Sequence, residues 1–100
     1  MKLGILVTTD RNLDHIAGLT HAAIRKGHEA TIFVMDDGVR LFGYSAFQSL
    51  CKIEGVSMCF CDYSTRLLGV SQEGMSKEIV CGSQYNNAVM NHHADGVIVL

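Results

Sequence analysis

One cysteine stands at a point of the sequence where thiol chemistry is favoured. Residues 56–60 are an apolar run that predicts a buried strand, and Cys61 follows it directly. Residues 62–68 then predict a short helix that Gly69 ends. A sulfur at the start of a helix faces free backbone N–H groups and the positive end of the helix dipole, which both favour thiolate. Cys61 is therefore the candidate nucleophile, with inert packing as the alternative.

The other three cysteines have plainer interpretations, because cysteine is often buried as a small apolar residue. Cys51 belongs to the apolar stripe of an expected helix, and Cys59 lies in the middle of the expected strand. We expect both to pack in the core. Cys81 ends a short expected strand at 78–81 and is interpreted either as a core residue or as a second thiol beside Cys61.

Two arginines could support an anion at the cysteine if the fold brings them near it. Arg40 and Arg66 are otherwise expected on the solvated surface, like most arginines. Acidic residues close by would oppose a thiolate or persulfide. These acidic residues are Asp36, Asp37 and Asp62.

The four cysteines and five histidines do not form a metal-binding motif. Cys59 and Cys61 are separated by one residue, whereas zinc sites use C-x₂₋₄-C spacing, and no second such pair exists. The adjacent His92 and His93 point to different sides of an expected helix. Neither G-x-G-x-x-G nor G-K-[ST] occurs, so we expect no metal, nucleotide or other organic cofactor.

Composition indicates one compact domain over residues 1–100, with 48% apolar residues and no proline. The formal charge of −2 and the scattered basic residues give no footprint for nucleic acid. No apolar segment is long enough to cross a bilayer, and residues 1–7 fit a first strand better than a signal peptide. We expect a cytoplasmic protein whose thiols stay reduced.

Apolar runs alternate with helical periodicity along the chain. A helix begins at Leu13 and closes at Gly27, a charged loop covers 36–40, and further helices are expected at 44–54, 62–68 and 82–91. The expected strands lie at 3–8, 30–35, 56–60, 78–81 and 97–100. This alternation predicts an α/β fold, a three-layer α/β/α sandwich on a parallel sheet. Ligands of such folds bind at the carboxyl ends of the strands, where Cys61 is expected.

Three stretches in this order resemble the DsrE/DsrF-like family, which includes the TusD-type sulfur-relay proteins. They are GHE at 27–29 with DGV at 37–39; GV at 55–56, Cys61 and GV at 69–70; and a helix from Gly82 that leads into ADGVI at 94–98. The chain departs from the usual relay subunits at 62–65, where DYST replaces a small, alanine-rich run. It is also shorter between Gly38 and Gly55.

The resemblance implies a five-stranded, flavodoxin-like parallel sheet and assembly into homotrimers or hexamers. It also implies that Cys61 carries sulfur as a persulfide between donor and acceptor proteins. In the family's sheet the third and fourth strands are neighbours, so Cys81 is expected within disulfide reach of Cys61. Aromatic residues such as Phe42 or Tyr44 are expected on the surface, where they would support assembly.

We therefore expect a small sulfur carrier of the sulfurtransferase type. The alternative is a non-catalytic subunit or a small-molecule-binding module that keeps the fold and uses Cys61 only for packing.

Overall fold

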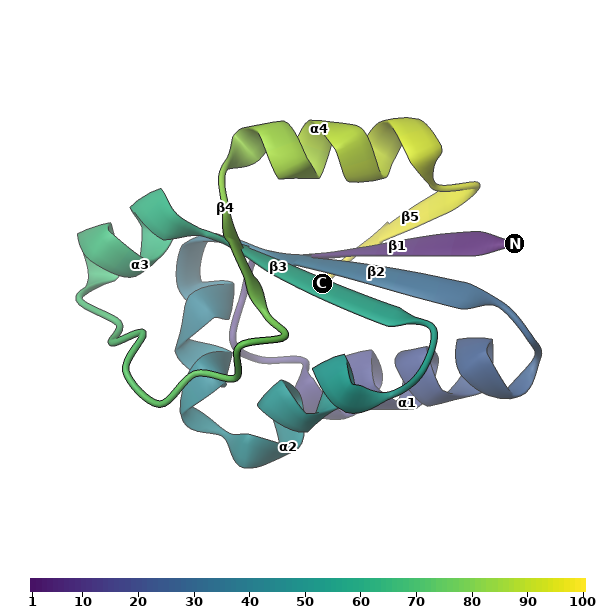
Figure 1. Ribbon diagram of the computed structural model, residues 1–100, viewed down its shortest axis with the longest axis horizontal. Coiled ribbons are helices and arrows are strands. Elements are labelled where there is room, and N and C mark those ends of the chain that lie inside the picture. The colour runs from purple at the N-terminus through teal and green to yellow at the C-terminus, as the bar shows by residue number, and fades with distance from the viewer.

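Five parallel strands form a single sheet in the computed structural model, which describes all of residues 1–100 (Figure 1). The strand order is β4-β3-β2-β1-β5, and every neighbouring pair is parallel. The strands are β1 Lys2–Val7, β2 Glu29–Val34, β3 Val56–Cys61, β4 Val80–Gly82 and β5 Gly96–Val99. The predicted five-stranded parallel sheet is thus confirmed, and its third and fourth strands are neighbours.

Helices cover both faces of this sheet, which confirms the three-layer architecture. Helices α1 Leu13–Arg25 and α2 Ser45–Gln48 lie on one face, and α4 Gln84–His93 lies on the other (Figure 1). Helix α3 Asp62–Leu68 extends beyond the carboxyl ends of the strands. No helix has the length and apolar character needed to span a bilayer.

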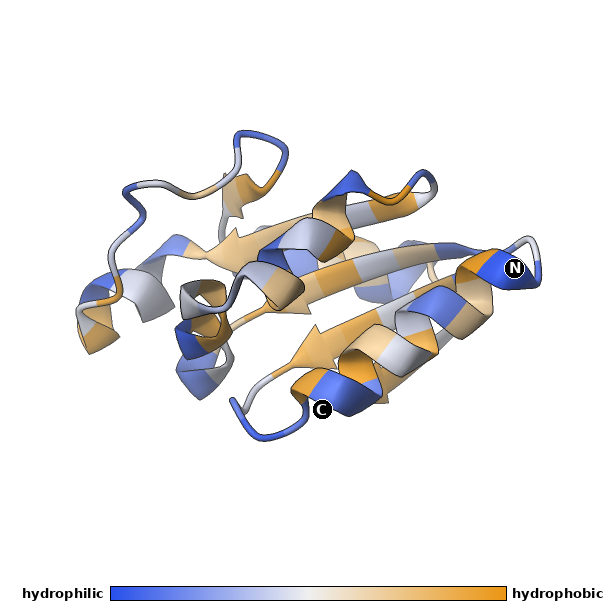
Figure 2. Ribbon diagram, turned by 90° about the horizontal axis from the view of Figure 1, so that it is seen from below, coloured by the Kyte–Doolittle hydropathy of each residue, from blue (hydrophilic) through white to orange (hydrophobic).

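The main core lies between the sheet and α1 with α2. It contains sixteen buried residues, among them Ile5, Ile32 and Phe60 from the three central strands. A smaller cluster on the opposite face joins Phe33 and Cys61 to Met90 of α4. Apolar colour accordingly runs along the strands, whereas the helices alternate between apolar and polar residues (Figure 2). Cys61 therefore points to the α4 side of the sheet.

The segment between β2 and β3 differs from its prediction. Short helical turns replace the expected loop at 36–40 and the expected helix at 44–54: η1 Asp36–Gly43, α2 and η2 Ser49–Lys52. A Cβ on Gly38 would lie 2.6 Å from the carbonyl oxygen of Val7, so glycine lets η1 pack closely on the end of β1. Side chains also compete for helical carbonyls, because Gln48 donates to Phe42 O at 2.7 Å and Ser49 to Ala46 O at 3.0 Å.

The prediction that Phe42 is exposed is wrong. Phe42 is buried and makes edge-to-face contacts with Phe47 and Phe60, with ring centroids 5.3 and 5.6 Å away. Tyr44, two residues later, is exposed. The burial of Phe42 is difficult to predict from the sequence, because η1 is a 3₁₀ helix. Its buried residues follow a period of three residues per turn and not the 3.6 of an α-helix.

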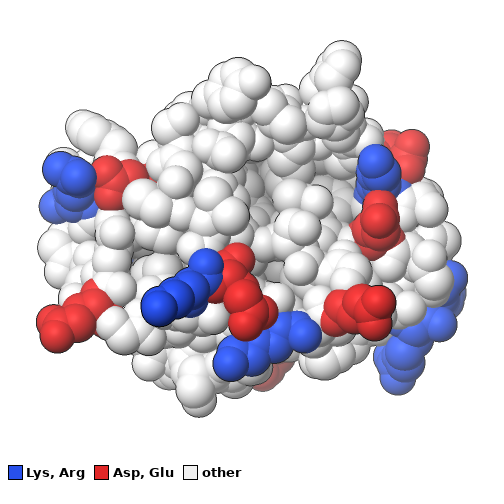
Figure 3. Space-filling view, in the orientation of Figure 1, with Lys and Arg blue, Asp and Glu red and all other residues white.

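The two elements after α3 begin later than predicted. Strand β4 has only three residues, and α4 begins at Gln84 because Ser83 is its N-cap. The Ser83 hydroxyl accepts from the N–H of Tyr85, and Asn86 Oδ1 accepts from the N–H of Ser83 at 3.0 Å. Helix α4 carries no Lys, Arg, Asp or Glu, and the upper part of Figure 3 is correspondingly free of charged side chains.

Candidate functional site

Cys61 is both the last residue of β3 and the N-cap of α3. Its backbone is extended, with φ −82° and ψ 113°, and no loop residue separates the strand from the helix. It lies opposite Gly82 of β4, at the carboxyl edge of the sheet. Its residue surface is 3% exposed, so only a small part of the side chain can be reached from solvent.

A surface pocket of about 770 Å³ opens above this cysteine. The ends of β2, β3 and β4 meet the first turns of α3 and α4 there. The lining residues include Met35, Cys61, Ser64, Gly82 and Gln84. The pocket is large enough to admit a side chain or a small thiol, and Cys61 is among the residues that line it.

The pKa of the Cys61 thiol is lowered from its ordinary value. Burial is the largest single influence and raises the pKa, but several hydrogen-bond donors together outweigh it. They are the hydroxyl and N–H of Ser64, the side-chain amide of Gln84 and the N–H of Tyr63. The two N–H groups belong to the second and third residues of α3, which are the groups that an N-cap normally binds. This direction agrees with the expectation from a sulfur at a helix start.

Ser64 and Gln84 were not identified from the sequence. Ser64 had a local signal, since it stands three residues after the N-cap, where a side chain can reach back to the cap. Gln84 had none, because it comes from α4 and reaches the site only through the pairing of β3 with β4.

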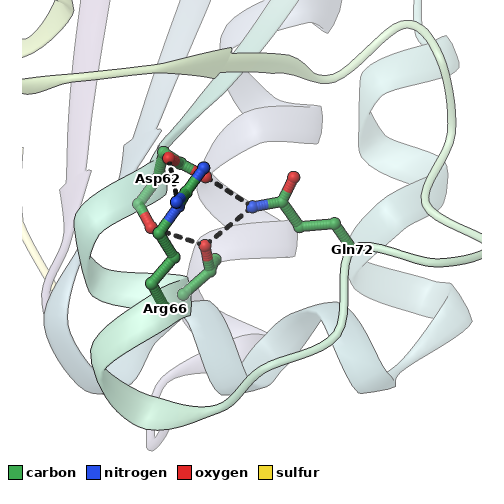
Figure 4. A network of polar contacts seen from close by, with 4 residues as sticks. Asp62, Arg66 and Gln72 are labelled. Carbon is green, nitrogen blue, oxygen red and sulfur yellow. Dashed lines mark hydrogen bonds and ion pairs between the residues drawn. The ribbon is translucent and has the colours of Figure 1, made fainter.

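Arg66 lies at the rim of the pocket, but its guanidinium is paired with the neighbouring carboxylate. Arg66 Nε is 2.7 Å from Asp62 Oδ2, and Gln72 Nε2 donates to Asp62 Oδ1 at 2.7 Å (Figure 4). Gln72 also donates to Thr65 at 2.9 Å, which ties the segment after α3 back to the helix. The Gln72 hydrogen bond has the largest influence on the pKa of Asp62 and lowers it. Desolvation comes next and raises the pKa, but the Gln72 bond and the charge of Arg66 together outweigh it. Both oxygens of the Asp62 carboxylate thus accept hydrogen bonds, one from Arg66 and one from Gln72.

Arg40 is not brought to the cysteine. Its Nε pairs with Asp37 Oδ1 at 3.2 Å on the exposed surface of η1. It lines a different pocket, together with Gln48 and Glu73. Neither arginine therefore presents a free charge to Cys61.

Cys81 lies on the strand next to Cys61 but on the other face of the sheet. The register pairs Cys81 with Phe60 and Gly82 with Cys61, and paired residues of parallel strands share a face. A disulfide between side chains that point apart requires backbone movement. Cys81 is exposed, so the core interpretation is wrong. Desolvation and the adjacent Asp62 carboxylate raise the pKa of its thiol, which makes it a weak nucleophile at neutral pH.

The other two cysteines lie away from the pocket. Cys51 is buried in the main core, as predicted. Cys59 is half-buried on the same face as Cys61, and its Sγ occupies the space beside Gly82, 2.6 Å from where a Cβ of residue 82 would lie. Desolvation, followed by the influence of Cys81, raises the pKa of Cys59 to about 11. Cys59 therefore stays a neutral thiol at physiological pH.

Comparison with known proteins gives structural neighbours only. No family model and no curated protein matches the sequence. The ychN protein from E. coli superposes with a TM-score of 0.74 at 17% identity, over 100% of both chains. MTH1491 from Methanobacterium thermoautotrophicum, described as a protein of unknown function, superposes with a TM-score of 0.70 at 13% identity, over 99% of this chain and 98% of that one.

The chain has a DsrE-like fold. The superpositions cover the full chain, so the whole α/β sandwich takes part in the likeness. At these identities the likeness concerns the fold, and the chemistry has to be argued from the site.

Proposed function

We propose that this protein is a small sulfur carrier that holds sulfur as a persulfide on Cys61. The observation that carries the proposal is the place of the Cys61 sulfur, which is buried at the junction of β3 and α3 and lines a pocket together with Ser64 and Gln84. Hydrogen bonding from these two residues and from the N–H of Tyr63 lowers the pKa of the thiol against the opposing effect of burial. These groups stabilise negative charge at that atom, as a thiolate and equally as a persulfide anion. The DsrE-like fold supports the same interpretation.

Loading is a transfer of one sulfur atom with no net oxidation. The Cys61 thiolate attacks the outer sulfur of a donor persulfide R–S–SH, a new S–S bond forms, and the donor's S–S bond breaks. The products are Cys61–S–SH and the donor thiolate R–S⁻, which takes up a proton from water. Delivery is the same step in reverse: an acceptor thiolate attacks the outer sulfur and leaves the Cys61 thiolate.

The pocket decides how a partner reaches the sulfur. Because Cys61 is almost fully buried, the donor or acceptor thiol has to enter the 770 Å³ pocket. A persulfide carries its outer sulfur about 2.05 Å further along the S–S bond, and thus toward the partner. The step uses no metal and no organic cofactor, and we expect it in the cytoplasm, where thiols stay reduced.

Mass spectrometry of the intact protein after incubation with a persulfide donor tests the proposal. We expect a gain of one sulfur in the wild type and in Cys81→Ser, which removes the exposed thiol as a matched control. Cys61→Ser should show no gain. A wild type that stays unmodified, or a Cys61→Ser variant that still gains sulfur, refutes the proposal.

A second candidate is a small-molecule-binding module in which Cys61 only packs. It is favoured by a pocket of about 440 Å³ between α4 and the amino ends of β1, β2 and β3. Native alkylation separates the two functions. Labelling of Cys61 in the folded protein at neutral pH supports the carrier, whereas labelling only after denaturation supports the module.

A further inference from the structure

Ser64 and Gln84 line the same pocket as Cys61 and lower the pKa of its thiol. Each of these two side chains is bound by one of two consecutive residues that follow β2. The N–H of Asp36 donates to Ser64 Oγ at 3.0 Å. Gln84 Nε2 donates to Met35 Sδ at 3.6 Å. Met35 is itself fixed to the sheet, because its N–H donates to the carbonyl of Val7 at 2.9 Å.

In the contact with Asp36, the hydroxyl of Ser64 acts as an acceptor. Ser64 is 4% exposed, so its hydroxyl has few partners to choose from. A serine inside a helix often donates to the carbonyl of the preceding turn, as Thr20 of α1 does to Ile16 at 2.7 Å. Ser64 makes no such bond, and its oxygen accepts from Asp36. No carbonyl of α3 therefore takes up its proton, and the Ser64 side chain lowers the pKa of the neighbouring Cys61 thiol as a hydrogen-bond donor.

The backbone of Asp36 is in an unusual conformation at this point. Its φ is +50°, and it is the one residue other than glycine with a positive φ. Aspartate and asparagine tolerate the left-handed region better than most residues, whereas β-branched residues do not. Strain of this kind persists where the surrounding structure holds it, often beside functional groups. Here the conformation aims the Asp36 N–H at Ser64.

We propose that Met35 and Asp36 are positioning residues, which hold Gln84 and Ser64 against Cys61 without touching the transferred sulfur. The inference rests on the role proposed for Cys61 and adds a part of the chain that is remote from it in sequence. If this is so, a substitution at Met35 changes the ionisation of Cys61 only through Gln84, and a substitution at Asp36 only through Ser64.

Ionisable groups from several elements surround the sulfur and have to be matched between variants. They are Asp36 of η1, Asp62, Tyr63 and Arg66 of α3, Cys59 of β3 and Cys81 of β4. A change at Asp36 removes one carboxylate from this group. The informative comparison is therefore Asp36→Asn with Asp36→Val, since both lose the charge and only the β-branched valine resists the left-handed backbone.

The measurement is the pH dependence of Cys61 alkylation in the full chain, followed by peptide mass spectrometry so that the other cysteines are kept. We expect Asp36→Asn to titrate like the wild type, or at lower pH. Both Asp36→Val and Ser64→Ala should lose one hydrogen bond to the charged sulfur. The ionisation constant of Cys61 should therefore be about tenfold smaller in Asp36→Val than in Asp36→Asn, and about tenfold smaller in Ser64→Ala than in the wild type. The double variant Asp36→Val/Ser64→Ala should have the same ionisation constant for Cys61 as Asp36→Val alone. An Asp36→Val protein that titrates like Asp36→Asn, or whose effect adds in full to that of Ser64→Ala, overturns the inference.

Met35→Leu provides an independent arm should Asp36→Val fail to fold, because leucine keeps the apolar volume and removes the acceptor of Gln84. Its ionisation constant for Cys61 should decrease, with no further decrease in Met35→Leu/Gln84→Ala. An unchanged constant in Met35→Leu overturns this half of the inference. Persulfide loading is read separately by mass: a protein with these couplings that never gains sulfur refutes the carrier role and leaves the positioning role standing.

Discussion

Gly82 is the position near Cys61 at which an added methyl group should lower the free energy of unfolding most. A Cβ there would lie 2.5 Å from Asn86 Oδ1 and 2.6 Å from Cys59 Sγ. Gly82→Ala must therefore displace the capping residue of α4, which costs about 1 kcal/mol, and overpack the face beside β3, which costs about 1–3 kcal/mol. The free energy of unfolding should fall by about 2–4 kcal/mol. At about 4–8 °C per kcal/mol for a domain of this size, Tm should fall by at least about 8 °C.

Thermal and urea unfolding of Gly82→Ala measure this loss. Gly18→Ala is the matched control, because Gly18 is exposed within α1 and a Cβ there meets no atom within 4 Å. That change should stabilise the protein by about 0.5–1 kcal/mol. Cys59→Ala should restore part of the loss in the Gly82→Ala protein, since it removes one of the two clashing atoms. A Gly82→Ala protein as stable as the wild type would refute the close packing of β4, Cys59 and the α4 cap.

Three further outcomes are expected. At mildly acidic pH, alkylation followed by peptide mapping should label the buried Cys61 before the exposed Cys81, because the pKa of the first is lowered and that of the second raised; the reverse order would contradict the site. Because the pKa of Cys61 is lowered in the folded protein, its thiolate stabilises the fold above the ordinary thiol pKa, and this contribution is lost as pH falls through the folded-state pKa. Urea unfolding should therefore show that the wild type gains stability relative to Cys61→Ser from neutral to alkaline pH. Light scattering should show a trimer or hexamer at micromolar concentration, since Val80 and Tyr85 are 53% and 73% exposed beside the uncharged α4, and a monomer would contradict this.

The sequence was sufficient for the sheet and for the place of Cys61. Strands that are covered on both faces are continuous apolar runs, and Gly27, Gly55 and Gly69 mark the points where the chain turns with positive φ. The position of Cys61 followed from two local signals, an apolar run and a helix start, which meet at one residue. Such local signals are readable because they depend on neighbours in the chain.

The surroundings of the cysteine depend on contacts that no local pattern encodes. Gln84 and Met35 are 49 residues apart and meet only because β2, β3 and β4 lie side by side. The face of Cys81 depends on its register with β3, and a shift of one residue would reverse it. Arg66 could support an anion as far as the sequence shows, but the fold pairs it with Asp62, whose other oxygen accepts from Gln72. Site chemistry was therefore less predictable than site position.

The direct junction between β3 and α3 links the order of a helix to the chemical state of one sulfur atom. The neutral thiol makes no capping hydrogen bond, so the first turn of α3 begins without a side-chain cap. A negatively charged sulfur at the same place would accept from the amides of Tyr63 and Ser64 and complete that turn. Ionisation of the sulfur, as a thiolate or as a persulfide anion, should then slow hydrogen exchange at these two amides relative to the neutral thiol. With seven residues, α3 is short enough for one cap to matter, so an incoming partner would meet a more stable helix when the sulfur is ionised than when it is a neutral thiol.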